Sequence, residues 1–136
     1  MIPSMKTIGY GRIINIISTS VKIPIKNLGV SNTIRGAVAS WSKTMANELA
    51  EFNITVNNIL PGLTETQRLN SLIELNAEKR GLSTEEIRKE MIAEIPMKRF
   101  GQSSEIAAVA AFLASPAASY VTGVSIPVDG GKTGTV

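Results

Sequence analysis

The pattern of hydrophobic residues predicts where the strands of this chain lie. Residues 11–18 ("GRIINIIS") place apolar, β-branched side chains at consecutive positions rather than at every second one. That pattern is typical of a strand covered on both faces, as in a parallel sheet. Residues 54–60 ("ITVNNIL") form a second β-rich run, and residues 123–131 ("GVSIPVDGG") predict a last strand followed by a turn.

The segments between these runs show helical spacing. In residues 32–51, apolar side chains recur every three or four positions, which predicts an amphipathic helix. Residues 64–81 are polar but keep the same spacing. A capping box at Ser83 and Glu86 predicts the start of a further helix. Residues 103–115 predict a compact, alanine-rich helix.

The order of these elements predicts the fold class. Strand, helix, strand, helical insert, helix and strand follow one another, which favours right-handed crossovers and a parallel sheet with helices on its faces. Residues 11–18 are so apolar that they suit a central strand whose neighbour is missing. We therefore expect an α/β fold of about three strands, the second half of a doubly wound parallel sheet, as a single unit over residues 1–136.

The composition of the chain excludes several classes of function. The chain has 136 residues, enough for one domain, with 43% hydrophobic residues, 18% charged residues and a net charge of +3. Its cations are scattered, so we expect no nucleic-acid partner. It contains no cysteine and no histidine, which excludes thiolate chemistry and removes the commonest general base and metal ligand. We expect no metal site, and any chemistry must come from the remaining polar side chains or a cofactor.

The sequence shows no membrane or export signal. No apolar run approaches the roughly 18 residues that span a bilayer. The N-terminus also lacks the basic-then-apolar pattern of a signal peptide. We therefore expect a cytoplasmic protein with no membrane partner.

The segment after the second strand, "PGLTET", is a candidate binding loop. Loops at the carboxyl ends of parallel strands are where open α/β sheets bind ligands. Pro61 fixes its φ angle, Gly62 permits close backbone approach, and Thr64 and Thr66 offer hydroxyl groups. The alternative is a plain strand-to-helix turn in which the threonines cap the helix, and the pattern leaves both open.

A second candidate combines Ser18, at the end of the first strand, with Ser31 and Arg35, one turn apart at the start of the helix. The loop between them can bring the three side chains to one pocket. The alternative is that Ser31 is a helix N-cap and Arg35 a surface cation. The helix face that continues from Arg35 carries small residues and is expected to pack on the sheet, so Arg35 is not expected to be fully solvated.

Four stretches resemble one family: "GRIINIIS", "RGAVASWSKTMANELAEFNITVNNILPGLTET", "RFGQSSEIAAVAAFLAS" and "YVTGVSIPVDGG". They resemble the C-terminal half of short-chain dehydrogenases/reductases, and within that family the 3-oxoacyl-(acyl carrier protein) reductases. The resemblance implies a Rossmann-type parallel sheet and hydride transfer between NAD or NADP and a small alcohol or ketone, with an acyl thioester as one candidate substrate. It also implies a homo-oligomer.

The resemblance implies roles for several residues. Ser18 matches the serine that hydrogen-bonds the substrate oxygen. Residues 67–95 match the helical substrate lid. The loop that holds the nicotinamide is matched by Pro61, Gly62, Leu63, Thr64 and Thr66.

The chain departs from the family at the central motif of Tyr, three residues and Lys, which falls here on Ser31 and Arg35. The chain therefore resembles an atypical subgroup of the family, which has Ser-Asn-x-x-Arg at this position. An aliphatic hydroxyl lacks the acidity of a phenol, and a guanidinium stays protonated, so the pair is a poor proton relay. Arg35 can still bind the ribose hydroxyls, and Ser31 can contact the substrate directly or through a water that fills the missing ring.

The family's glycine-rich phosphate loop and Asn-Asn-Ala-Gly strand would precede Met1. We therefore expect an NAD(P)-dependent oxidoreductase that is incomplete, and weak or inactive, as this chain alone. The alternative is a non-catalytic oligomerisation or interaction module, or a truncated gene remnant, because an unpaired apolar strand edge favours association.

Overall fold

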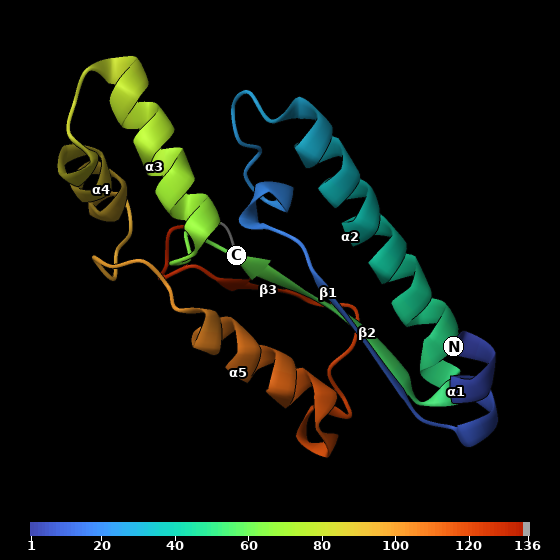
Figure 1. Ribbon diagram of the computed structural model, residues 1–136. Helices are drawn as coiled ribbons and strands as arrows, with labels where there is room; N and C mark the ends of the chain where they lie inside the picture. The colour runs from blue at the N-terminus through green and yellow to red at the C-terminus, as the bar shows by residue number, and fades with distance from the viewer. Residues whose placement is uncertain (135–136) are drawn as a thin grey trace.

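The three predicted strands form one parallel sheet. The computed structural model describes residues 1–134, and the last two residues of the expected unit lie outside the described part. The strands are β1 (Gly11–Ile16), β2 (Ile54–Pro61) and β3 (Ser125–Val128), in the order β1-β2-β3 with both pairings parallel (Figure 1). This confirms the expected fold class.

Helices cover both faces of the sheet. Helix α2 (Gly29–Leu49) lies on one face and α5 (Ser103–Ala114) on the other (Figure 1). On the α2 side, Leu49 packs with Val56, and on the α5 side Leu113 packs with Ile59. The central strand β2 is consequently buried from its first residue to Leu60, which explains its continuous apolar pattern.

The helical insert forms a pair, α3 (Gln67–Arg80) and α4 (Thr84–Ala93), at the carboxyl end of the sheet (Figure 1). The predicted capping box is present: Ser83 N–H donates to the Glu86 carboxylate, and Glu86 N–H donates to Ser83 Oγ. The pair has its own apolar cluster, formed by Leu69, Ile73, Ala77, Ile87, Ile95 and Phe100.

The sequence pattern missed α1 (Ile2–Ile8). This helix has two turns, too few for a recurring apolar spacing, and it is held by tertiary contacts instead. A Cβ on Gly11 would lie 2.7 Å from Met5 Sδ, so the glycine lets α1 approach β1 closely. Three short 3-10 helices complete the fold: η1 (Thr19–Val21), η2 (Ala50–Phe52) and η3 (Pro116–Ala118).

Helix α2 begins before Ser31, which overturns the alternative that Ser31 is its N-cap. The N-cap is Leu28, whose carbonyl oxygen accepts from Asn32 N–H at 2.8 Å. The Asn32 side chain also donates to the carbonyl oxygen of Ile25, which fixes the first turn to the preceding loop. Ser31 therefore lies inside the first turn, and its hydroxyl is not used for capping.

A buried polar network crosses the core between α2 and the sheet. Asn58 on β2 accepts at Oδ1 from Ser42 Oγ (2.7 Å) and from Asn15 Nδ2 (3.1 Å). Its Nδ2 donates to Ser125 Oγ at 3.0 Å. The Asn58 side chain thus joins all three strands to α2, whereas that of Asn57 bonds the main chain of Val121 and Val124 before β3, so both asparagines of this apolar strand have partners.

Candidate functional site

A cavity of about 320 Å³ lies where β1 and β2 end. Its walls are the segment after β1, the first turns of α2, the loop after β2 and the first turns of α3. All the residues singled out from the sequence line it: Ser18, Ser31, Arg35, Pro61, Gly62, Leu63, Thr64 and Thr66. The fold therefore brings both candidate clusters to one place, as the carboxyl edge of a parallel sheet does.

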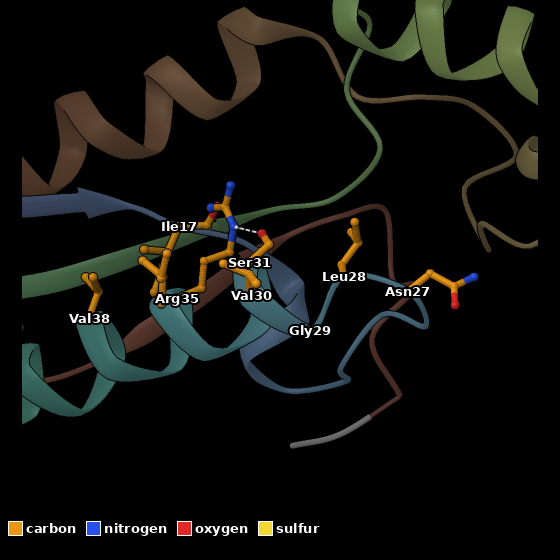
Figure 2. A pocket seen from close by; sticks show the side chains of 9 residues that line it. Ile17, Asn27, Leu28, Gly29, Val30, Ser31, Arg35 and Val38 are labelled. Carbon is orange, nitrogen blue, oxygen red and sulfur yellow. Dashed lines mark hydrogen bonds between the residues drawn. The ribbon is translucent and has the colours of Figure 1, made fainter.

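Ser31 and Arg35 are bonded to each other. Arg35 Nε donates to Ser31 Oγ at 3.1 Å, and a terminal guanidinium nitrogen donates to the main-chain carbonyl oxygen of Ile17. Figure 2 shows the Arg35 side chain reaching from α2 towards Ile17. Arg35 is half-buried, so the alternative of a freely solvated surface cation is wrong.

The hydroxyl hydrogen of Ser31 is free for a ligand. Ser31 Oγ already accepts from Arg35, and no acceptor for its own hydrogen is present in residues 1–134. A hydroxyl that accepts from a cation becomes a stronger donor, because the two hydrogen bonds polarise one another. The pair can therefore donate one charge-assisted hydrogen bond into the cavity.

The segment after β1 supplies two further hydroxyls. Ser18 Oγ accepts from Ser20 N–H at 3.1 Å and so caps η1. Ser20 is only 3% exposed, and its Oγ has no hydrogen-bond partner within the described residues. Sequence reasoning missed Ser20, although its spacing of two from Ser18 at a strand end was a possible signal.

The loop after β2 is held by backbone contacts on two sides. Gly62 N–H donates to the carbonyl oxygen of Val128 on β3 at 3.0 Å. Gly101 N–H donates to Leu63 O at 2.9 Å, and Glu65 N–H donates to Gly101 O at 2.8 Å. Gly62 is required for close approach, because a Cβ there would lie 2.6 Å from the Cβ of Asp129.

Asp129 fixes the turn after β3 against this loop. Burial raises the pKa of Asp129, but hydrogen bonds from Thr133, Gly131 and Lys132 outweigh it and hold that pKa below its ordinary value. The carboxylate therefore stays ionised and keeps the turn in place beside Gly62.

The threonines of the loop act mainly within it. Thr64 Oγ1 donates to Gly62 O at 3.2 Å, and Thr66 Oγ1 accepts from Leu69 N–H at 3.3 Å, capping α3. The alternative that a threonine caps the helix thus holds for Thr66, which also lines the cavity. The backbone N–H groups of Leu63 and Thr64 have no hydrogen-bond acceptor in the described part of the chain. This loop therefore has two adjacent donors without a partner there.

The charged side chains that line the cavity are both arginines, Arg35 and Arg68, and no carboxylate is among the lining residues. The nearest loop acid, Glu65, forms an ion pair with Arg88 at 2.7 Å instead. Sequence reasoning missed Arg68. The sequence signal for Arg68 was its position in the first turn of a helix, where the helix macrodipole disfavours a positive charge.

A second, larger hollow of about 680 Å³ adjoins the first and shares Ile17, Leu28, Ser31 and Arg35 with it (Figure 2). Its walls are mostly apolar and include Leu28, Val30 and Val38. Val30 and Ile34 on α2 are 78% and 59% exposed, and Ile16 at the end of β1 is 53% exposed. The free edge of β1 therefore lies in an apolar surface.

Comparison with known sequences places this chain in a family. A family model described as Enoyl-(Acyl carrier protein) reductase matches residues 1–133. The chain is 41% identical over 128 residues to the NADPH-dependent reductase BacG of Bacillus subtilis, covering 94% of this chain and 49% of BacG. It is 37% identical over 131 residues to the 3-oxoacyl-[acyl-carrier-protein] reductase FabG of Staphylococcus epidermidis, covering 95% of this chain and 48% of FabG. The chain thus spans about half the length of these curated relatives.

Solved structures support the same family. A short chain dehydrogenase family protein from Francisella tularensis superposes with a TM-score of 0.86 at 34% identity, covering 91% of this chain and 51% of that one. YwfH, an NADPH-dependent reductase involved in bacilysin biosynthesis, gives a TM-score of 0.90 at 39% identity, covering 97% and 50%. No described helix has the length and apolarity needed to cross a membrane. From the matched residues and the shared fold, the chain belongs to the short-chain dehydrogenase/reductase family.

Proposed function

We propose that this chain forms the substrate and nicotinamide side of an NAD(P)-dependent oxidoreductase that transfers hydride at a ketone or alcohol. The observation that carries the proposal is the cavity in which the Ser31–Arg35 pair, Ser18 and the loop at residues 61–66 meet. Small-molecule carbonyl compounds, 3-oxoacyl thioesters among them, are the proposed substrates. The chain spans about half of its relatives, so we propose that alone it is weakly active or inactive.

The loop after β2 has donors that suit a nicotinamide. The unpaired N–H groups of Leu63 and Thr64 can bind a carboxamide oxygen, and Gly62 allows a close approach of the backbone. Arg35 lies at the same cavity and can hold the ribose hydroxyls. When bound, the nicotinamide supplies or accepts the hydride.

The chain's own side chains would stabilise the charge that develops on the substrate oxygen. Ser18 and Ser31 each keep a hydroxyl hydrogen that can be donated to a carbonyl oxygen, and Arg35 strengthens the Ser31 donor. Neither Ser31 nor Arg35 readily releases a proton. The proton that neutralises the alkoxide therefore comes from water, which has room to enter where the family's tyrosine ring would lie.

A chimera tests this proposal. The 131 residues of this chain that match FabG of Staphylococcus epidermidis replace their counterpart in that protein, and reduction of a 3-oxoacyl thioester is followed by the loss of NADPH absorbance. We expect turnover that falls about 10²-fold on Ser31→Ala, since removing a donor to a developing oxyanion has effects of this size. Lys79→Gln, an exposed change on α3, should leave turnover unchanged.

Two results would count against the proposal. One is a folded chimera, judged by circular dichroism, that does not reduce the 3-oxoacyl thioester while intact FabG is active in the same assay. The other is a Ser31→Ala chimera that is as active as its parent.

The free edge of β1 favours a second candidate, a module for association between chains. Val30, Ile34 and Ile16 expose apolar surface beside that edge, and such surfaces bind partners. We propose a homo-oligomer on this ground. The two functions are compatible, because Val30, Ile34 and Ile16 are not among the residues that line the cavity.

A further inference from the structure

We infer that Asn32 is a positioning residue, whose side chain keeps Ser31 inside the first turn of α2 and in contact with Arg35. The inference rests on the proposed function, because it concerns the hydroxyl group that would donate to the substrate oxygen. Asn32 is not among the residues that line the cavity, so it acts on the site through Ser31.

The first turn of α2 has little of its own to hold it in place. Its N-cap, Leu28, makes no side-chain hydrogen bond to the helix. Gly29 follows, and glycine is unfavourable in a helix because of its backbone freedom. Val30 is 78% exposed, so its side chain gains little from packing. Residues 28–30 therefore do not by themselves fix where α2 begins.

Ser31 offers α2 an alternative start. Serine is among the best N-cap residues, whereas leucine is among the poorest. If the helix began at Ser31, the serine oxygen would accept from the backbone N–H of Thr33 or Ile34. The hydroxyl group would then serve the helix instead of Arg35 and the cavity.

Asn32 makes the contacts that favour the earlier start. Its backbone N–H donates to Leu28 O at 2.8 Å, and its Nδ2 donates to Ile25 O, also at 2.8 Å. Asn32 Oδ1 is buried without a partner in residues 1–134, which is unfavourable, so the Nδ2 bond is what holds the amide here. A start at Ser31 would unwind the turn that carries Leu28 and break these bonds.

The start of α2 decides where the Ser31 hydroxyl lies. With Leu28 as the N-cap, Ser31 Oγ accepts from Arg35 Nε at 3.1 Å (Figure 2). Ile25 and Leu28 also line the cavity, and both belong to the segment that the Asn32 side chain ties to α2. One amide thus fixes the proposed hydrogen-bond donor together with part of the apolar wall beside it.

Nuclear magnetic resonance of the chain alone tests the inference without cofactor or turnover. Asn32→Ala removes the Nδ2 donor but raises the helix propensity, so a purely local effect would strengthen the first turn. The variant, labelled with nitrogen-15 and carbon-13, is compared with the parent by the backbone shifts of residues 29–31 and by the Nε–H resonance of Arg35. Asn47→Ala, the same change on the exposed side of α2, is the control.

We expect residues 29–31 of Asn32→Ala to lose their helical shifts. The Arg35 Nε–H resonance should move to its position in Ser31→Ala, because both changes remove the same hydrogen bond. Asn32→Asp keeps the size of the side chain but lacks the donor and should behave like Asn32→Ala, whereas Asn47→Ala should match the parent. Helical shifts at residues 29–31 with an unchanged Arg35 resonance in a folded Asn32→Ala chain would overturn the inference.

The FabG chimera gives a second readout, which a purely structural role would not move. Asn32→Ala should lower kcat by up to about 10²-fold, since a misplacement of about 1 Å at a catalytic group has effects of this size. Added to Ser31→Ala, it should lower kcat no further, because both changes disable one donor. Two effects that multiply would contradict the inference. The resonance measurement needs no turnover, so it decides the inference even if the chimera is inactive.

Discussion

At the scale of single residues, Gly62 controls how closely the loop after β2 approaches β3. In Gly62→Ala, the new Cβ would lie 2.6 Å from the Cβ and 2.8 Å from the Cα of Asp129. We expect a loss of about 1–3 kcal/mol in the free energy of unfolding, because backbone has to shift to relieve the overlap. Denaturant unfolding measures it.

A second glycine provides the control for this prediction. Gly36 lies inside α2, and a Cβ there would meet nothing within 4 Å. Gly36→Ala should therefore raise the free energy of unfolding by about 0.5–1 kcal/mol, since alanine favours helix. A Gly62→Ala chain as stable as its parent would show that the loop does not need this close approach.

Removal of the buried Asn58 amide should lower the stability of the fold more than removal of a surface amide. Asn58→Ala removes its bonds to Asn15, Ser42 and Ser125, and we expect a loss of about 1–3 kcal/mol because buried polar groups are left unpaired. Asn47→Ala, on the exposed side of α2, should change stability by less than about 0.5 kcal/mol. Equal effects in thermal unfolding would contradict the role of the network.

Residues of the site differ in how far sequence could reveal them. Ser31 and Arg35 were identified because they occupy a motif position, and Gly62 because it follows a strand in a recognisable loop. Ser20 and Arg68 belong to η1 and α3, and the cavity between them forms only on folding. The local signals at Ser20 and Arg68 therefore could not show that both residues line one cavity.

At the scale of elements, the start of α5 should depend on pH. Arg99 and the N–H of Gln102 bind the Glu105 carboxylate and lower its pKa from 4.5 to about 2. A carboxyl group with a depressed pKa in the folded state stabilises the fold above its unfolded pKa. That contribution is lost as the pH falls from about 4.5 towards 2.

Comparison of variants isolates this contribution. We expect the parent to have a higher Tm than Glu105→Gln at neutral pH, and the difference to shrink between pH 4.5 and pH 2. Glu85→Gln, in the first turn of α4, should show a much smaller difference because no hydrogen bond holds that side chain within the described residues. A difference between the parent and Glu105→Gln that stays constant with pH would refute the assignment.

Element boundaries show what local pattern can and cannot predict. The strands and the capped helix α4 followed from apolar runs and from Ser83, because those signals act over a few neighbouring residues. The start of α2 did not, since Asn32 ties the first turn to a loop carbonyl and Ser31 is engaged by Arg35. Helix α1 depends on Met5 packing near Gly11, a contact that no spacing rule contains.

At the scale of the whole molecule, the free β1 edge and the apolar face of α2 predict association. We expect the sedimentation coefficient to rise with concentration, because Val30 and Ile34 expose apolar side chains next to an unpaired strand. Ile34→Lys should weaken the association, whereas Ser40→Lys adds the same charge elsewhere on α2 and should not. A chain that stays monomeric at all accessible concentrations would exclude the association module.

The central claim is that the cavity at the ends of β1 and β2 holds a nicotinamide next to Arg35. The direct measurement is a titration of the purified chain with reduced nicotinamide mononucleotide and with NADPH, followed by nicotinamide fluorescence. We predict weak, saturable binding with similar affinity for both, since we propose that this chain forms only the nicotinamide side of the site, and weaker binding in Arg35→Gln. No saturable binding by the folded chain, or equal binding by Arg35→Gln, would contradict the claim.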